Sequence, residues 1–192
     1  MKEPRLGLAA RALYALLVFI YRRHRFTAVG TAPAERRFVI IAVPHTSNWD
    51  FPNYIGVTRE LGLRTHFMAK TSLFRWPFGG FMRQVGGVPV DRRAAQDMVQ
   101  QMIAEFAARD DFVLTIAPEG TRKSVTEWRT GFYRIALGAG VPIVCGFMDY
   151  AHRRAGLGPV IYPTGDYAAD MASAFAFYAE MHGRNATGNP SV

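Results

Sequence analysis

Short, almost continuously apolar segments alternate along this chain with longer segments whose apolar residues recur at helical spacing. The apolar segments occupy residues 38–43, 65–70, 87–90, 112–117, 142–148 and 159–162. Strands that are buried on both faces have this composition, and such strands are typical of parallel sheets covered by helices. We therefore expect an α/β fold, with a mostly parallel central sheet flanked by helices.

Helices are expected between these strands, at residues 48–61, 94–109, 130–139 and 168–181. The second has the clearest pattern, since Met98, Met102 and Phe106 repeat every four residues. Gly140 follows the third, at the position where a glycine commonly ends a helix. The length of 192 residues favours a single domain, which we place at residues 26–183, with a disordered tail at 184–192.

The charge of the chain points to an anionic partner. The net charge is +8, and all but 3 of the 23 basic residues are arginines. Arginine suits phosphate and carboxylate groups, so nucleic acid, an anionic membrane and phosphorylated small molecules are candidates, although the charge could serve solubility alone. No nucleic-acid-binding motif is present and the arginines are scattered among apolar segments, so we expect no nucleic-acid partner. The single cysteine, Cys145, excludes an intramolecular disulfide and is expected to be a small buried hydrophobe.

The N-terminal segment, residues 1–25, combines an apolar run with a basic end. The run from Ala12 to Tyr21 would form a helix of roughly 15 Å, about half the thickness of a ~30 Å hydrocarbon core. Arg22, Arg23 and Arg25 follow directly, where a signal peptide would have small residues at its cleavage site. We expect an uncleaved amphipathic helix that associates with a membrane surface; the alternatives are a signal peptide and a helix packed on the core.

Polar clusters follow three of the predicted strands: "PHTSNWD", "DRR" and "PEGTRK". Functional side chains of such sheets lie beyond the carboxyl ends of the strands, so these clusters are expected to converge on one site. In the first cluster, His45 and Asp50 can meet only if His45 precedes the helix and Asp50 lies in its first turn, with Thr46 or Ser47 as N-cap. The pair could then be a catalytic base with its orienting carboxylate, or Asp50 could serve only in helix capping.

The third cluster has the composition of an anion site. Gly120 would let backbone amides approach an anion, Thr121 supplies a hydroxyl and Arg122 a planar cationic group. The spacing of a P-loop is absent, and a loop with solvated charges is the alternative. Arg92, in the second cluster, is another candidate anion ligand.

Taken together, these clusters resemble the glycerolipid acyltransferase family, whose members include lysophosphatidate acyltransferases. "HTSNWD" resembles its HxxxxD motif, and "GGVPVDR", "PEGTR" and "GVPIV" resemble its second, third and fourth blocks, in the same order. The resemblance implies transfer of a fatty acyl group from acyl-CoA or acyl-acyl carrier protein to a lysophospholipid hydroxyl, such as that of 1-acylglycerol-3-phosphate. It further implies that His45 is the base and Asp50 its orienting partner. The implied acceptor site consists of Arg92 and Arg122 as phosphate ligands, lined by Glu119, Gly120 and Thr121. No metal and no cofactor are implied.

The resemblance has two departures, since Pro44 and Ala117 replace the Asn and Phe that commonly stand at these positions. The acceptor could therefore be a non-phosphate lipid such as a lyso-ornithine lipid, and a non-catalytic lipid-binding protein is a further alternative. We expect the protein at the cytoplasmic face of the inner or plasma membrane, in contact with membrane lipids. Residues 72–85, rich in large apolar side chains, could wall an acyl channel, contact the bilayer or belong to the core. His24, His66, His152 and His182 are expected to be structural or exposed.

Overall fold

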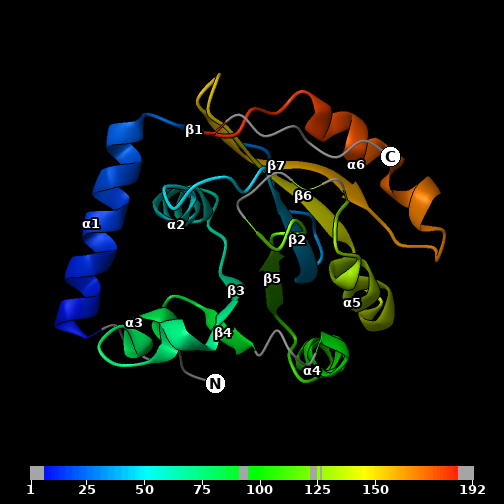
Figure 1. The fold of residues 1–192 in the computed structure, drawn as a ribbon, viewed down its shortest axis with the longest axis horizontal. Coiled ribbons are helices and arrows are strands. Elements are labelled where there is room, and N and C mark those ends of the chain that lie inside the picture. The colour runs from blue at the N-terminus through cyan, green and yellow to red at the C-terminus, as the bar shows by residue number, and fades with distance from the viewer. Residues whose placement is uncertain (1–6, 91–94, 122–124, 126, 186–192) are drawn as a thin grey trace.

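A computed structural model describes residues 7–90, 95–121, 125 and 127–185, without the side chains of 95–97 (Figure 1). Its seven-stranded sheet has the order β1-β7-β6-β2-β5-β3-β4. The strands are β1 (Thr27–Val29), β2 (Arg37–Val43), β3 (Thr65–Lys70), β4 (Gly87–Val90), β5 (Phe112–Ile116), β6 (Ile143–Asp149) and β7 (Arg154–Ile161). All neighbouring strands are parallel except β6 and β7, which confirms the predicted α/β fold with a mostly parallel sheet.

Two strands differ from the prediction by more than one residue at an end. β7 begins at Arg154 rather than at residue 159, because its first half is rich in small residues and lacks a continuous apolar run. β1 was not predicted, since its three residues are too few to carry a pattern. Together they extend the sheet beyond β6.

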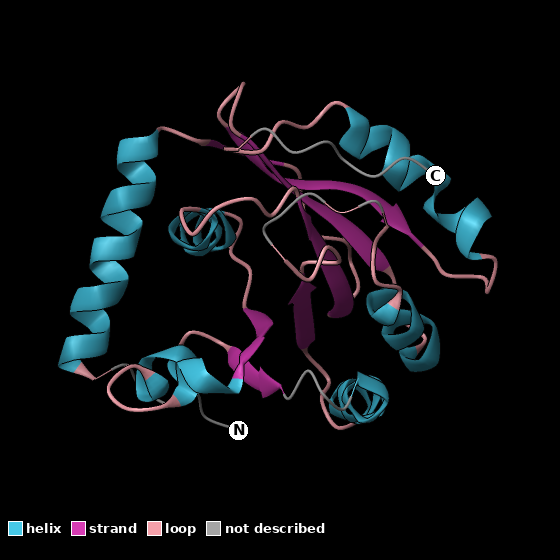
Figure 2. Cartoon of the chain, viewed as in Figure 1, coloured by secondary structure: helices cyan, strands magenta, loops and turns pink. Residues whose placement is uncertain are grey.

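The helices cover both faces of the sheet, as Figure 2 shows. They are α1 (Leu8–His24), α2 (Asp50–Glu60), η1 (Thr71–Phe74), α3 (Gly79–Gln84), α4 (Ala95–Ala107), α5 (Gly131–Ala139) and α6 (Tyr167–Ala179). In Figure 1, α1 and α2 lie to the left of the central strands, and α4, α5 and α6 lie to the right. Gly140 ends α5 in the left-handed conformation, with φ of 61°, as its position in the sequence predicts.

The core is divided by the sheet because successive side chains of a strand point to opposite faces. In β2, Val39 and Ile41 belong to the larger cluster, which contains residues of α4, α5 and α6. Phe38 and Ile40 face the other way, into a smaller cluster against which Leu61 packs at the end of α2. The α2 face therefore has the thinner packing, and this is where the large cavity described below lies.

Helix α1 packs against α2 through one side. The Tyr21 side chain is buried and its hydroxyl donates a hydrogen bond to Glu60 Oε2 at 2.8 Å. On the other side, Leu16 and Phe19 remain 52% and 60% exposed. None of the helices in the described part of the chain has the length and apolar character needed to cross a membrane.

Candidate active site

The loop from β2 to α2 carries the predicted pair. His45 precedes the helix and Asp50 is its first residue, as the spacing predicts, but the helix starts two residues later than expected. Neither Thr46 nor Ser47 is the N-cap; that position is Trp49, whose side chain makes no capping bond. Instead, Asp50 Oδ2 accepts the backbone N–H groups of Thr46 and Ser47, each at 2.9 Å. The carboxylate therefore holds the loop that leads into its own helix.

The same carboxylate oxygen faces the imidazole. His45 Nδ1 lies 3.2 Å from Asp50 Oδ2, and the two side chains are 29% and 8% exposed. With Nδ1 engaged by a carboxylate, Nε2 is the nitrogen that can take a proton from another molecule. Asp50 therefore does both things that the sequence suggested as alternatives: it accepts backbone N–H groups at the start of the helix, and it is the partner of the histidine.

The third cluster meets the first at Glu119. This largely buried side chain accepts the backbone N–H of His45 with both carboxylate oxygens, at 3.1 and 3.0 Å. Burial raises the pKa of Glu119 to about 7, although the hydrogen bond from His45 acts in the opposite direction. Gly120, with φ of 65°, turns the chain after it, and Thr121 is exposed. The predicted convergence of the first and third clusters is therefore present, whereas Arg92 and Arg122 lie outside the described residues.

Sequence patterns did not reveal two further side chains that form hydrogen bonds at the His45–Asp50 pair. The Tyr150 hydroxyl donates to Asp50 Oδ1 at 2.8 Å, and Asn53 Nδ2 donates to the Tyr150 hydroxyl at 3.0 Å. Burial, followed by the negative charge of Asp50, raises the pKa of Tyr150. Asn53 could have been suspected from its position one helical turn after Asp50. Tyr150 is distant in sequence and no local signal identifies it.

The C-terminal segment also contacts the loop. Asn185 Nδ2 donates to the backbone oxygen of Thr46 at 2.7 Å, and the Arg184 guanidinium lies 5.1 Å from the ring centroid of Trp49. These are the described residues of the tail that we expected to be disordered, so at least its first two residues have defined contacts.

A cavity of about 650 Å³ opens beside His45 and runs between α2 and the sheet. Its polar end is formed by His45, Asn48 and Asp50, and Leu61 and Leu63 line it near the end of α2. Most of the remaining wall is apolar, and Ser72, Leu73 and Met82 contribute to it from the aromatic-rich segment. The prediction that residues 72–85 could wall a channel is thus supported for these positions.

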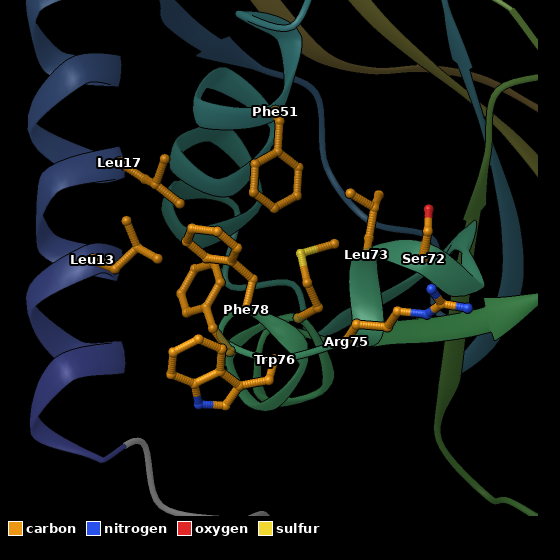
Figure 3. A pocket seen from close by; sticks show the side chains of 10 residues that line it. Leu13, Leu17, Phe51, Ser72, Leu73, Arg75, Trp76 and Phe78 are labelled. Atoms are coloured by element: carbon orange, nitrogen blue, oxygen red, sulfur yellow. The ribbon is translucent and has the colours of Figure 1, made fainter.

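The rest of that segment has mixed surroundings. Phe74 is buried, whereas Trp76 is 94% exposed and Phe78 61% exposed. A surface pocket of about 280 Å³ separates this segment from α1; Leu13 and Leu17 point into it from the helix (Figure 3). Phe51, Leu73 and Met82 line both hollows, so the cavity lies directly beside this exposed apolar surface.

Among the described residues, Asp149, His152 and His182 have ligand atoms close enough, within 4.8 Å, to hold a metal ion together. The buried Asp149 carboxylate is already engaged, since it accepts from His152 Nδ1 at 2.6 Å and lies 3.4 Å from Arg154. Burial alone would raise the pKa of Asp149, but the hydrogen bonds from His152 outweigh it and lower that pKa. We therefore assign this cluster to the turn between β6 and β7, and the absence of a metal from the reaction stays a prediction.

Known proteins resemble this chain in sequence and in fold. A family model described as Acyltransferase matches residues 23–148. Among solved structures, the 1-acyl-sn-glycerophosphate (LPA) acyltransferase PlsC from Thermotoga maritima is similar, with a TM-score of 0.58 and 19% sequence identity. The similarity covers 86% of this chain and 76% of that one. No curated protein sequence matches. Because the family model spans well over half of the 192 residues, the chain belongs to the acyltransferase family.

Proposed function

We propose that this protein transfers a fatty acyl group from an acyl-thioester, on coenzyme A or acyl carrier protein, to the hydroxyl of a lysophospholipid. The observation that supports this most is the placement of the His45–Asp50 pair at the polar end of a largely apolar cavity. The fold shared with an LPA acyltransferase favours 1-acylglycerol-3-phosphate as the acceptor. A serine or cysteine nucleophile is not required, because the acceptor supplies its own hydroxyl.

In the proposed reaction, His45 Nε2 takes the proton of the acceptor hydroxyl as its oxygen bonds to the thioester carbonyl carbon. The carbon–sulfur bond then breaks, and the imidazolium returns the proton to the departing thiolate, so that an ester and a free thiol are formed. Asp50 holds the imidazole in the required tautomer and stabilises its charged form, at 3.2 Å. Positioned base catalysis of this kind contributes typically about 10²–10⁴-fold. The thioester is already activated, so the reaction needs neither a metal nor another cofactor.

We place the acyl chain of the donor in the cavity. Helix α2, along which the cavity runs, has 11 residues and is therefore about 16 Å long, and the cavity lining is largely apolar. Burial of apolar surface stabilises by about 25 cal/mol per Å², so an acyl chain would bind there more strongly than a polar molecule of equal length. The carbonyl of such a chain would lie at the polar end, beside His45.

For the acceptor, we propose Arg92 and Arg122 as phosphate ligands, with Glu119, Gly120 and Thr121 lining that side of the site. Glu119 supports this proposal, because its carboxylate contacts the backbone of His45 and so lies next to the base. The membrane is the source of the acceptor lipid, which is consistent with the exposed apolar side chains of Leu16, Phe19, Trp76 and Phe78. Residues 1–25 would associate with the cytoplasmic face of that membrane.

The test is acyl transfer by the purified protein, with acyl-CoA and lysophosphatidate as substrates and release of the free thiol as the signal. His45→Ala is expected to abolish transfer without unfolding the protein, and Asp50→Asn to impair it severely. A His45→Ala variant with turnover within about tenfold of wild type would remove the base from this mechanism. Transfer to a lyso-ornithine lipid but not to lysophosphatidate would change the acceptor, and binding without transfer to either would indicate a lipid-binding protein.

A further inference from the structure

A row of buried or half-buried side chains continues from the His45–Asp50 pair into the protein. Tyr150 follows β6 directly, and its hydroxyl donates to Asp50 Oδ1 at 2.8 Å. The other oxygen, Oδ2, faces His45 Nδ1 and the backbone N–H groups described above. Each carboxylate oxygen therefore has its own donors, which prevents the carboxylate from rotating away from the imidazole.

Asn53 determines the direction of the Tyr150 hydrogen bond. Its side chain is fully buried, and its amide nitrogen donates to the Tyr150 hydroxyl at 3.0 Å. An amide NH₂ group can only donate, so the hydroxyl accepts there and its single proton is available for Asp50. The tyrosine is thereby kept as a donor toward the carboxylate.

His24 extends the row to helix α1. His24 Nδ1 lies 2.7 Å from Asn53 Oδ1, the atom left to accept when the amide nitrogen faces Tyr150. His24 is the last residue of α1, and its ring packs edge-on against Trp49, with ring centroids 5.4 Å apart. The hydrogen-bonded row thus connects the C-terminal end of α1 with the carboxylate at the start of α2.

We propose that Tyr150 and Asn53 are positioning residues for the His45–Asp50 pair, and that His24 couples their orientation to the packing of α1. The proposal rests on the proposed function, in which His45 is the base. Among the described residues that line the cavity, neither Tyr150 nor Asn53 occurs. Loss of either is therefore expected to lower kcat, because the base is less well oriented, while leaving both KM values nearly unchanged.

The first test is Tyr150→Phe, which removes the hydroxyl but keeps the ring that packs edge-on against Phe26 at 5.1 Å. We expect kcat to fall about tenfold and the KM values for acyl-CoA and lysophosphatidate to stay within about twofold. Tyr162→Phe is the matched control: its hydroxyl donates to Glu35 Oε1 at 2.9 Å on the surface, so it loses the same kind of bond far from the pair. The control is expected to keep wild-type kcat.

The second test asks whether Asn53 acts through Tyr150. Asn53→Leu keeps the branched shape of the side chain without its polar atoms and frees the hydroxyl to rotate, so kcat should fall several-fold. In the Tyr150→Phe background, the same change should cause little further loss, because the bond that it orients is already absent. His24→Phe, which keeps a ring beside Trp49, should lower kcat by a smaller factor and have no effect once Asn53 is leucine.

The outcomes separate this proposal from the proposed function. Suppose that the wild-type protein transfers the acyl group and His45→Ala does not. An unchanged kcat in Tyr150→Phe would then overturn the positioning role while leaving the proposed function intact. Fully additive losses in the Asn53→Leu and Tyr150→Phe pair would overturn the coupling through Tyr150. A wild-type protein that transfers no acyl group would overturn the proposed function and, with it, this inference. Thermal unfolding of each variant shows whether a lost kcat reflects lost folding, and only variants that unfold near the wild-type temperature count.

Discussion

Asp50 is the residue on which the site depends, since one carboxylate serves three purposes. It accepts two backbone N–H groups of its own loop, faces His45, and accepts the hydroxyl of Tyr150. Hydrogen bonds to charged groups each contribute about 1.5–3 kcal/mol, so these donors hold the carboxylate firmly in its position beside the imidazole. A negatively charged partner is what a histidine needs when it becomes an imidazolium.

Glu119 is the other buried carboxylate at this site, and burial raises its pKa to about 7. The folded protein binds a proton at Glu119 over a range, from about pH 4.5 to 7, in which the unfolded chain has released it. The contribution of Glu119 to the free energy of unfolding therefore decreases as the pH rises through this range, and is constant above it.

We predict that Glu119→Gln is more stable than wild type at pH 8, by on the order of 2–3 kcal/mol, because the ionised form no longer has to be buried. The difference should largely disappear at pH 4.5. Urea unfolding at the two pH values measures it, and the exposed Glu180→Gln provides the same chemical change at the surface. A difference that does not depend on pH would show that ionisation of Glu119 is not its cause.

Among the elements, the pair α1 and α2 depends on a single glycine. A Cβ atom at Gly56 would lie 2.0 Å from Cγ of Tyr21, so any larger residue forces the two helices apart. The Tyr21–Glu60 hydrogen bond and the contact between His24 and Asn53 lie at the same interface.

Gly56→Ala is therefore expected to destabilise the protein by roughly 1–3 kcal/mol, the usual cost of overpacking. Gly80→Ala in α3 is the matched control, since a Cβ atom there has no neighbour within 4 Å. That change should be neutral or stabilising, because alanine favours helix. Thermal unfolding of both variants measures the effect, and equal midpoints would contradict the close contact between α1 and α2.

The half-buried Leu13 and Leu17 of helix α1 line one surface pocket together with the exposed Trp76 and Phe78. With Arg22, Arg23 and Arg25 at the end of α1, this surface should bind anionic vesicles more strongly than neutral ones, and added salt should weaken the preference.

Replacing the 94% exposed Trp76 by Ser should reduce the fraction of protein that sediments with vesicles. Leu137→Ser, at an exposed position of α5 across the sheet, should leave sedimentation unchanged. If Trp76→Ser binds vesicles as well as the control does, the membrane contacts another surface.

For the whole molecule, the thin packing between α2 and the sheet is the feature with the widest consequence. The α4–α5–α6 face is filled by a large cluster, whereas the α2 face leaves a cavity of about 650 Å³. Interiors are normally packed without voids of this size, and we therefore propose that the cavity binds a ligand.

If this cavity holds the acyl chain, filling the end near Leu63 should shorten the chains that the enzyme accepts. We predict that Leu63→Phe lowers kcat/KM for long-chain acyl-CoA more than for medium-chain acyl-CoA, because the longer chain loses its last contacts. Leu137→Phe is the control outside the cavity. A uniform decrease across chain lengths would place the acyl chain elsewhere.

The sequence by itself determined the elements of this fold that depend on local pattern. β3 and β4 begin and end as predicted, because an apolar run bounded by polar residues is a local property. The same holds for Gly140 at the end of α5 and for the order of His45 and Asp50 around a helix start. Each of these follows from backbone sterics and from spacing within a few residues.

Tertiary structure decided the features that depend on residues far apart in the chain. Asp50 and Tyr150 are 100 positions apart, and His24 and Asn53 are 29 apart, so no periodic pattern could relate them. The cavity results from how closely α2 approaches the sheet, a distance set by side chains of several elements at once. Such contacts depend on how the elements pack in the folded chain, so they cannot be predicted from patterns within a few residues.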